Sequence, residues 1–584
     1  MKLNYVRGYK LITAYKHVRI FLSLLKQYNI RYFVISPGSR NMSVVKSVED
    51  DPFFTCYSVV DERSAAYFAV GLSLALRSPV VISSTSGQAT RNYMPGMTEA
   101  FYRKAPILVV TTDYDENLAS QHNMQSIRQM GIPSDTAKVS VDIPIIKDAN
   151  DEHLVTRRIN EALDALTRNG GGPAHLNLRI NEYWVKGDDS LETARKITRY
   201  IPSDTEWPTI GSRRVLLVIG AHHPFLESEM LSIENFARKH DVAIYVNHIS
   251  NYNGDRSVHG NIVLQTGGFK HLCPDLLITI GGLLGDYPLD GSLRNAHIEH
   301  WRVCEDGNYL DAYNSLTKVF ECPEHYFFSR MAEAVPAEPG HGYFEDWQNE
   351  LSKISAPDDL PLSHALIAKK LSPLVPAKSN LHFAILNSLR NWEVFSIDRS
   401  ITCYSNVAGF GIDGCLSTFL GQSLASKQLC FLIIGDLSFF YDMNAIGNRH
   451  IKNNVRIVLV NNKGGCEFRM YSHMANQFGD ASNRYIGAAG HFGESAEGWV
   501  KNNKFTYLTA RTKDELDQAL NILVRASDNP ILLEVCTTMK DDSDALLAIV
   551  EANKHSPQSE KIVQAIKNSI PPDIKQRIKK AMGR

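Results

Sequence analysis

The sequence carries almost no net charge, because 62 basic and 63 acidic side chains leave a formal charge of −1. A chain without an excess of either sign has no overall field that attracts nucleic acid or a membrane surface, and we expect neither as a partner. It also has no apolar run of membrane-spanning length, and its start lacks the ordered features of a signal peptide. These absences favour a cytoplasmic location.

The nine cysteines show no pattern of a metal or disulfide framework, since they form no C-x-x-C pair and have no histidine partners at zinc spacing. This usage is typical of reduced, mostly buried thiols. The middle segment at 214–282, which has a Rossmann-like pattern, lacks a G-x-G-x-x-G motif with a following acidic residue, and this disfavours a dinucleotide oxidoreductase.

The length of 584 residues and the hydrophobic content of 44% suit several globular domains. Short apolar segments alternate with glycine-containing turns and helical stretches, which is typical of parallel sheets covered by helices on both faces. The sequence therefore predicts an α/β fold with three doubly wound parallel-sheet domains. The expected divisions are domains at 1–190, 205–340 and 360–548, a C-terminal helical tail at 549–584, and linkers at 192–209 and 338–359.

Two predicted strands in the last third end in polar loops. The strand at 429–434 runs into Gly435-Asp436, and the strand at 456–460 runs into a loop that contains Asn462 and Gly464. A carboxylate, an amide oxygen and a glycine carbonyl are ligands that suit Mg²⁺, with Mn²⁺ as the alternative ion. Gly435 and loop N–H groups such as that of Ser438 can face phosphate oxygens. The competing interpretation is an ordinary βα turn followed by a hairpin-like turn.

The first third also offers polar residues at predicted strand ends. After a helix expected over 2–29 and a strand over 31–35, the S-P-G-S-R turn at 36–40 could bind an anion, with Arg40 as a planar fork for a carboxylate. A plain turn with a surface arginine explains this stretch equally well. Glu62 follows a strand expected over 56–60 and precedes a helix, so it either stabilises the helix dipole or serves a proton relay.

Several motifs in chain order resemble one enzyme family. They are S-P-G-S-R, D-E-R, T-S-G-Q-A-x-x-N-Y-x-P and Q-x-x-R-Q in the first third, Y-S-N and G-F-G-I-D-G in the last, and G-D with N-N, in which Asp436 and Asn462 lie 26 positions apart. This set resembles the thiamine diphosphate (ThDP) enzymes, and most closely the family of 2-succinyl-5-enolpyruvyl-6-hydroxy-3-cyclohexene-1-carboxylate (SEPHCHC) synthases of menaquinone biosynthesis. The resemblance covers residues from about 31 to about 547.

The resemblance implies a role for each domain and for particular residues. The three domains would be a pyrimidine-binding, a central Rossmann-like and a diphosphate-binding domain, and each site would be completed by a second subunit, in a homodimer or a dimer of dimers. Glu62 would contact the aminopyrimidine of the cofactor, and Ile412 would support the thiazolium ring. The implied catalytic residues are Glu62, Arg40 and Gln125; the cofactor-binding residues are Thr85, Ser86, Gly87, Asn92, Ser405, Asn406, Gly411, Ile412, Gly435, Leu437, Ser438 and Gly465; the metal ligands are Asp436, Asn462 and Gly464.

The chain departs from that family where cationic side chains recognise anionic substrates. Four such places carry Tyr114, Asp286-Tyr287, Trp392 and Val407, although Arg40 is kept and Arg390 lies two positions from one of them. Because arginine–carboxylate pairs are charge-assisted, we expect a ThDP- and Mg²⁺-dependent 2-oxo acid decarboxylase or carboligase with a different donor and an unknown acceptor. Pyruvate is the simplest donor. The alternatives are a SEPHCHC synthase, which uses 2-oxoglutarate and isochorismate, and a non-catalytic ThDP-fold binding protein.

Overall fold

Three parallel sheets of six, seven and six strands form the framework of the computed structural model, which confirms the predicted α/β class. The structure describes residues 12–187, 190–294, 296–333, 342–489 and 494–554. The chain forms two compact units, one reaching to Thr205 and including Asp306–Glu321, the other comprising the rest from Glu206 onward. The domain divisions expected from the sequence stay predictions. Residues 555–584, most of the expected tail, lie outside the described part.

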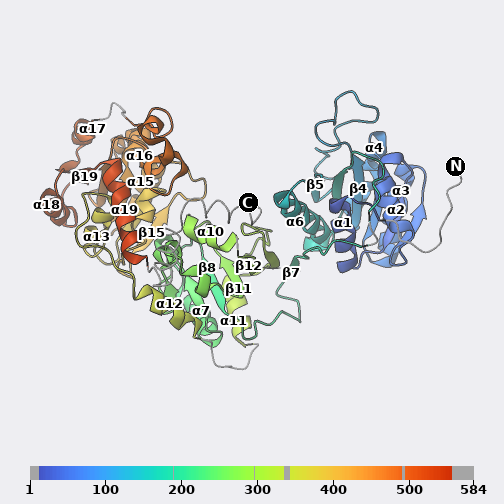
Figure 1. Ribbon diagram of the computed structural model, residues 1–584, viewed down its shortest axis with the longest axis horizontal. Coiled ribbons are helices and arrows are strands. Elements are labelled where there is room, and N and C mark those ends of the chain that lie inside the picture. The colour runs from blue at the N-terminus through green and yellow to red at the C-terminus, as the bar shows by residue number, and fades with distance from the viewer. Residues whose placement is uncertain (1–11, 188–189, 295, 334–341, 490–493, 555–584) are drawn as a thin grey trace, which may run out of the picture. The chain divides into compact units, whose positions relative to one another are not determined.

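The first sheet belongs to the first unit and has the strand order β2-β1-β3-β4-β6-β5. Alternate side chains face opposite layers: Phe33 and Val81 join one apolar cluster with α1 and α6, and Val34 and Ile82 join another with α3 and α5. The two layers can be followed in Figure 1. The elements are β1 (Tyr32–Ile35), β2 (Thr55–Ser58), β3 (Val80–Ser84), β4 (Ile107–Asp113), β5 (Val139–Ile143), β6 (Ala174–Arg179), α1 (Lys16–Gln27), α2 (Met42–Glu49), α3 (Glu62–Leu76), α4 (Gln88–Asn92), α5 (Met94–Arg103) and α6 (Ala149–Ala165).

Of the helix expected over 2–29, residues 2–11 lie outside the described part, and from residue 12 onward the helix begins only at Lys16. Thr13 lies in an isolated antiparallel bridge with Lys186, and the backbone N–H of Thr13 donates to Ser47 Oγ at 3.0 Å. The apolar periodicity that includes Ile12 misled the prediction, because Ile12 is buried beside this bridge and not on a helix face.

The second sheet draws strands from both units. In the second unit, β8, β9, β10, β11 and β12 pair in the order β10-β9-β8-β11-β12, and in the first unit β13 pairs with β7. The elements are β7 (Thr198–Tyr200), β8 (Val215–Ile219), β9 (Ala243–Tyr245), β10 (Ser257–Val258), β11 (Leu276–Ile280), β12 (Glu299–Val303), β13 (Leu316–Phe320), α7 (Glu227–Lys239), α8 (Asn261–Gln265), α9 (Phe269–Leu272), α10 (Tyr287–Arg294), α11 (Glu324–Glu333) and α12 (Tyr343–Leu351).

Both expected linkers contain regular structure. The stretch 192–209 includes β7, which gains its hydrogen bonds from β13, more than a hundred residues later in the chain. The stretch 338–359 includes α12, whose Tyr343 and Trp347 are almost fully buried. Two buried aromatic side chains four residues apart fix this short helix on the second unit.

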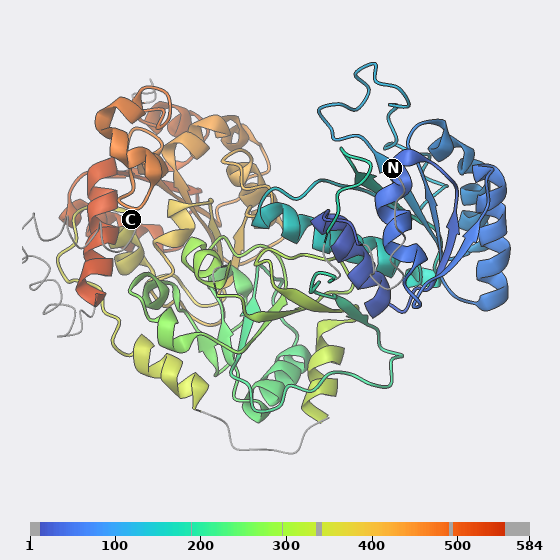
Figure 2. The same ribbon diagram turned by 45° about the vertical axis from the view of Figure 1, so that its right-hand side comes forward.

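The third sheet repeats the topology of the first, with the order β15-β14-β16-β17-β19-β18. Its faces are again covered by two apolar clusters, and the red helix α19 packs on one of them (Figure 2). The elements are β14 (Asn380–Phe383), β15 (Thr402–Ser405), β16 (Cys430–Gly435), β17 (Val455–Asn461), β18 (Thr506–Ala510), β19 (Ile531–Cys536), α13 (His364–Leu371), α14 (Asn387–Arg390), α15 (Cys415–Leu424), α16 (Asp436–Tyr441), α17 (Glu497–Asn502), α18 (Lys513–Leu523) and α19 (Met539–Asn553).

In the first and third sheets the chain order reverses beside the first strand, between β1 and β3 and between β14 and β16. Open parallel sheets bind ligands outside the carboxyl ends of their strands at such switch points. No helix within the described ranges is both long and apolar enough to cross a membrane.

Candidate functional site

Asp436 connects the two loops at the carboxyl ends of β16 and β17. The strands are neighbours, with Gly435 in register with Val460. The Asp436 side chain is buried, and its Oδ2 accepts the backbone N–H of Gly464 at 3.0 Å while Oδ1 accepts that of Leu437 at 2.8 Å. One carboxylate thus fixes both loops and lies at the start of α16.

Asn462 presents an amide oxygen that has no hydrogen-bond partner among the residues that the structure describes. Its Nδ2 donates to Asp542 Oδ2 at 2.9 Å, whereas its Oδ1 is buried and accepts no hydrogen bond. Asp542 is itself held, since its Oδ1 accepts the backbone N–H of His364 at 2.7 Å. A buried acceptor left unsatisfied is costly, so an oxygen-seeking cation fits this position.

The glycines of this region keep space open or permit close packing. A Cβ added at Gly435 would meet nothing within 4 Å, so the end of β16 borders free space. A Cβ at Gly464 would lie 2.8 Å from the Ala489 Cα, and one at Gly465 would lie 2.7 Å from the Gly487 carbonyl oxygen. The loop can therefore adopt this path only with glycine at both positions. The residues present fit a divalent cation and a diphosphate at this edge.

The loop between β15 and α15 lies against the same strand end. Ser438 Oγ donates to the Ile412 carbonyl oxygen at 2.6 Å, which ties the loop to α16. Ile412 keeps 36% of its side chain exposed, and Asn406 Nδ2 donates to Thr418 Oγ1 at 3.0 Å. Ser405 Oγ is buried without a hydrogen-bond partner. A Cβ at Gly411 would lie 2.3 Å from Asp413 Oδ1, so a larger residue there would displace the Asp413 side chain.

In the first unit, Glu62 is the first residue of α3 and is held by Asn92. The helix is capped by Asp61, whose carboxylate accepts the backbone N–H groups of Arg63 and Ser64. Asn92 Nδ2 donates to Glu62 Oε2 at 3.0 Å, which leaves Oε1 for another donor. Glu62 is half-buried, so its carboxylate remains accessible.

The turns after β1 and β3 approach each other closely at the switch point. A Cβ at Gly38 would lie 2.2 Å from the Thr85 Cβ, and both Thr85 and Ser86 are buried. Gly87 has a φ of +82°, and its N–H donates to Gln129 Oε1 at 2.8 Å. Gln129 therefore positions this turn. Gln125, the residue expected from the sequence, is exposed, and its backbone lies against Gly87.

Arg40 is buried with only 4% of its surface exposed and is not open to solvent as an anion site. Its Nη1 donates to the carbonyl oxygen of Ile180, and its Cζ lies 3.5 Å from the centroid of the Tyr114 ring. Tyr114 OH donates to the Met124 carbonyl oxygen at 2.7 Å, which holds the ring in place. Tyr114 thus covers one face of the retained guanidinium.

A cavity of about 590 Å³ in the second unit adjoins the loops of Gly464 and Ile412. Arg390 Nη1 and Nη2 bind Glu467 Oε2 and Oε1 at 3.0 and 3.2 Å in its wall. Of the altered positions, Tyr287 lines the cavity. A Cβ at Gly285, in the same turn as Tyr287, would lie 3.6 Å from Val407 Cγ1, so Val407 is close to that turn. The residues that line the cavity are Leu264, Gln265, Tyr287, Pro288, Leu386, Arg390, Phe410, Glu467, Phe468, Tyr471, Ser472, His473 and Leu546.

Two altered positions do not face this cavity. Trp392, expected to narrow the substrate pocket, is fully buried in the core of the third sheet, with its ring centroid 5.3 Å from that of Phe383. Asp286 is also buried, and its carboxylate accepts Tyr245 OH at 2.5 Å and Asn261 Nδ2 at 2.9 Å. Neither side chain is available to a substrate, because Trp392 is enclosed by apolar neighbours and the Asp286 carboxylate is hydrogen-bonded within the protein.

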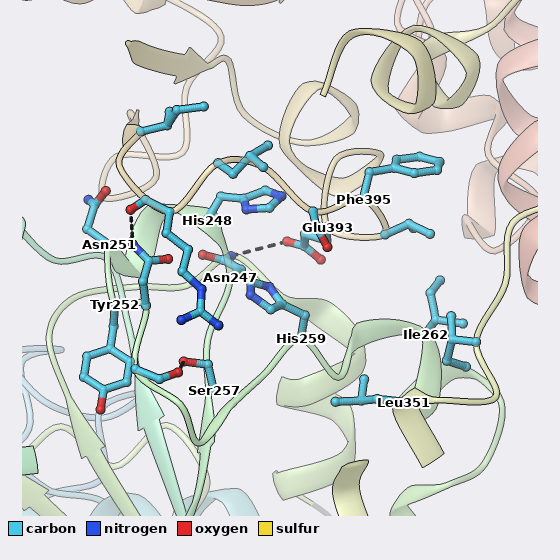
Figure 3. Close-up of a pocket in the computed structure, with 18 of the residues that line it drawn as sticks. Asn247, His248, Asn251, Tyr252, Ser257, His259, Ile262, Leu351, Glu393 and Phe395 are labelled. Atoms are coloured by element: carbon cyan, nitrogen blue, oxygen red, sulfur yellow. Dashed lines mark hydrogen bonds between the residues drawn. The ribbon is translucent and has the colours of Figure 1, made fainter. Parts of the chain in front are cut away.

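A second cavity, of about 420 Å³, is lined in part by Glu393 and Phe395 of the segment that follows α14 (Figure 3). Asn247 Nδ2 donates to Glu393 Oε1 at 3.3 Å, and Glu393 Oε2 has no hydrogen-bond partner. Burial, followed by the nearby Asp286 carboxylate, raises the pKa of Glu393 well above its ordinary value. The carboxyl is therefore held in its neutral form over a wider pH range than a free glutamate.

The structure groups the expected residues within each unit. Glu62, Asn92 and the turn at 85–87 gather in the first, and the loops of Asp436, Asn462 and Ile412 gather in the second. Sequence reasoning missed Gln129, Asp542 and Glu467. Gln129 lies in the Q-x-x-R-Q motif and could have been weighed beside Gln125, whereas Asp542 and Glu467 carried no local signal.

Comparison with protein families places residues 16–132 in the N-terminal TPP-binding domain of thiamine pyrophosphate enzymes. The SEPHCHC synthase of Phocaeicola vulgatus is 32% identical over 554 residues, which cover 91% of this chain and 97% of that protein. The synthase of Bacteroides fragilis is 31% identical over 555 residues, 91% of this chain and 98% of that protein. That of Bacteroides thetaiotaomicron is 32% identical over 561 residues, covering 91% and 97%.

Proposed function

The chain belongs to the thiamine diphosphate-dependent enzymes, in the family of the SEPHCHC synthases, and from this premise we propose that it decarboxylates a 2-oxo acid and joins the remaining acyl unit to an acceptor. Bound ThDP would accept the electron pair left when the bond to CO₂ breaks and return it as the new carbon–carbon bond forms. The single observation that carries the proposal is the buried, unsatisfied Asn462 oxygen in the loop that Asp436 holds through the Gly464 N–H.

The residues of the second unit would bind the diphosphate end. Asp436, Asn462 and the Gly464 carbonyl would hold Mg²⁺, or Mn²⁺ in its place, with phosphate and water completing an oxygen shell. The free space beside Gly435 and the N–H groups at the start of α16 would receive phosphate oxygens. Ile412, whose side chain remains partly exposed, would support the ring system from below.

Glu62 would act on the pyrimidine end by holding a proton against a ring nitrogen. Asn92 fixes one carboxylate oxygen, so the other can point in one direction toward the ring. A positioned carboxylate of this kind moves a proton efficiently when its geometry is fixed. The turn at 85–87, held by Gln129, would line the same end of the cofactor.

We further propose a homodimer, or a dimer of dimers, in which each site takes its pyrimidine end from one subunit and its diphosphate end from the other. Support comes from the face of α3 that follows Glu62, where Tyr67, Phe68 and Leu74 are 48%, 46% and 39% exposed. Gly71 on that helix has nothing within 4 Å of an added Cβ. Large apolar side chains around an open glycine suit close packing against a second copy.

The proposed donor is smaller or less anionic than 2-oxoglutarate, with pyruvate as the simplest choice. Tyr114 covers Arg40, and Glu467 pairs with Arg390, so neither guanidinium is open to a substrate carboxylate. A SEPHCHC synthase with unusual anion binding is the second candidate, and the 31–32% identity over 91% of the chain favours it. A ThDP-fold protein without catalysis is the third, and the intact Glu62, Asp436 and Asn462 weigh against it.

The test is incubation of the protein, loaded with ThDP and Mg²⁺, with pyruvate and with 2-oxoglutarate while CO₂ release is followed. The proposal expects release from pyruvate and little from 2-oxoglutarate. Release from 2-oxoglutarate alone would favour the synthase, and ThDP binding without release from any 2-oxo acid would favour the non-catalytic protein.

A further inference from the structure

The cavity of about 590 Å³ has a wall whose charge is cancelled within the protein. Arg390 and Glu467 face each other through two parallel hydrogen bonds of 3.0 and 3.2 Å. Only 13% and 14% of their side chains are exposed, so water screens the pair weakly. A planar guanidinium that is already bound to a carboxylate in this fork geometry has little remaining capacity for a second anion.

Four aromatic side chains contribute to the rest of the wall, and one of them is fixed by a hydrogen bond. Tyr287, Phe410, Phe468 and Tyr471 line the cavity, and the Arg390 Cζ lies 5.3 Å from the centroid of the Tyr287 ring. Tyr471 OH donates to Gln265 Oε1 at 2.8 Å. Among the described residues that line the cavity, Arg390 is the one lysine or arginine, and Glu467 neutralises it.

The position of the cavity connects it to the reacting end of the proposed cofactor site. Phe410 is two residues before Ile412, and Glu467 is two residues after Gly465 in the 3-10 turn η5 (Cys466–Arg469). Arg390 ends α14, which follows β14 at the switch point of the third sheet. The cavity wall therefore includes residues of the same two loops that carry Ile412 and Gly464.

We propose that Glu467 determines substrate specificity by occupying the guanidinium of Arg390, so that this cavity accepts a 2-oxo acid whose side chain is apolar and uncharged. This inference rests on the proposed function. An incoming carboxylate would have to displace Glu467 from Arg390 and would then leave two carboxylates around one cation in a weakly screened wall. An aliphatic or aromatic side chain instead packs on the four rings and leaves the ion pair intact.

In this proposal Glu467 excludes charged substrates, and Arg390 would bind an anion if Glu467 did not occupy its guanidinium. Replacing Glu467 by glutamine removes the competing charge and keeps the size of the side chain. The guanidinium then becomes available, so the variant should gain activity toward an acid with a second carboxylate. Replacing both residues by glutamine removes the cation as well, and this double variant should not gain it.

The experiment compares two donors of equal chain length, 2-oxopentanoate and 2-oxoglutarate, which differ in a terminal methyl group or carboxylate. The protein is loaded with ThDP and Mg²⁺, and kcat/KM is obtained from CO₂ release. The wild-type protein should prefer 2-oxopentanoate by at least tenfold. E467Q should shift this ratio toward 2-oxoglutarate by at least tenfold, and R390Q/E467Q should shift it by less than threefold.

A matched control is D480N, because Asp480 also pairs with an arginine of η5, through Arg469 Nη2 at 3.1 Å, but does not line the cavity. It should leave the ratio unchanged. Calorimetric binding of the two corresponding acylphosphonates, which cannot lose CO₂, provides a second readout that does not depend on turnover and also reports whether each variant is folded.

The outcomes separate the two hypotheses. If no 2-oxo acid releases CO₂ from the wild-type protein, the proposed function fails. If CO₂ is released but the wild type prefers 2-oxoglutarate, or if E467Q leaves both the ratio and the acylphosphonate affinities unchanged, the specificity role of Glu467 is wrong while the proposed function stands.

Discussion

The amide of Asn462 is oriented by Asp542, whose Oδ2 accepts the Asn462 Nδ2 hydrogen at 2.9 Å and thereby leaves Oδ1 as the free acceptor. The two residues are 80 positions apart, and they meet because α19 packs beside the loop that follows β17. Partners that orient a metal ligand commonly influence metal affinity by about 10–100-fold.

We therefore expect D542A to weaken Mg²⁺-dependent ThDP binding by about tenfold or more. The variant lets the Asn462 amide rotate, so its oxygen no longer faces the metal position. Calorimetric titration of ThDP at fixed Mg²⁺ measures the change. D541N is the control, because Asp541 is the neighbouring acidic residue on the same helix and accepts a hydrogen bond from the N-cap residue Thr538. Equal affinities for the wild type and D542A would show that Asp542 does not orient the ligand.

Replacement of Glu62 by glutamine should lower CO₂ release about 100-fold or more while ThDP affinity changes by less than a few-fold. Glutamine keeps the hydrogen bond with Asn92 but cannot carry the proton. Single-turnover release and calorimetry on the same preparation separate the two effects. E99Q, an exposed change on α5, serves as the control. An E62Q variant with wild-type turnover would remove Glu62 from the proton relay.

The stacking of Tyr114 on Arg40 should protect the guanidinium from modification. We expect phenylglyoxal to leave Arg40 unmodified in the wild type and to modify it in Y114A, because the ring that lies 3.5 Å away is then missing. Loss of the cation–π contact should also reduce the free energy of unfolding by about 2 kcal/mol. Y114F keeps the ring and should protect Arg40 like the wild type. Peptide mass spectrometry measures the modification of Arg40. Equal modification of Arg40 in all three proteins would contradict the predicted protection by the ring.

Acid should destabilise the first unit through His175. Burial lowers the pKa of His175 to about 4, and both ring nitrogens lie within hydrogen-bond distance of Thr111 and Ser140 hydroxyls. In the unfolded chain this histidine binds a proton near pH 6.5, whereas in the folded chain its imidazole stays neutral until about pH 4. The stability that the neutral, hydrogen-bonded imidazole contributes is therefore present above pH 6.5 and is lost as the pH falls from 6.5 toward 4. Between pH 7 and pH 5 this histidine alone should reduce the free energy of unfolding by about 2 kcal/mol.

Denaturant unfolding of the wild type and H175Q at several pH values measures that contribution. The variant should start from lower stability at pH 7, because glutamine replaces only part of the hydrogen bonding, but its stability should fall less between pH 7 and pH 5. A pH dependence identical to that of the wild type would show that His175 does not titrate on unfolding.

Local patterns predicted those parts of the fold that are defined by local sequence. The strands expected at 31–35, 429–434 and 456–460 occur within one residue of the predicted bounds, because continuous apolar runs specify them. β7 was missed because Thr-Arg-Tyr has no apolar run and becomes a strand only through pairing with β13. The start of α1 was misplaced for a similar reason, since the bridge of Thr13 to Lys186 depends on a distant segment.

The same distinction applies to the candidate site. Asp436 and Asn462 could be singled out because their spacing reflects one strand–helix–strand unit. Their partners could not, since Asp542 and Glu467 are 80 and 77 positions from Asn462 and Arg390. Tyr114 covers the guanidinium of Arg40, and this contact likewise depends on side-chain packing between separate turns. Sequence patterns identified the loops, whereas tertiary contacts determine which polar side chains of those loops remain available to a ligand.

Binding of ThDP with and without Mg²⁺ tests the central claim most directly. Calorimetric titration of the full chain should give a saturable ThDP isotherm with Mg²⁺, an affinity at least tenfold lower with EDTA, and the same low affinity for D436N in either condition. No ThDP binding, or binding that neither Mg²⁺ nor Asp436 affects, would contradict the assignment of Asp436, Asn462 and Gly464 to a metal-held diphosphate.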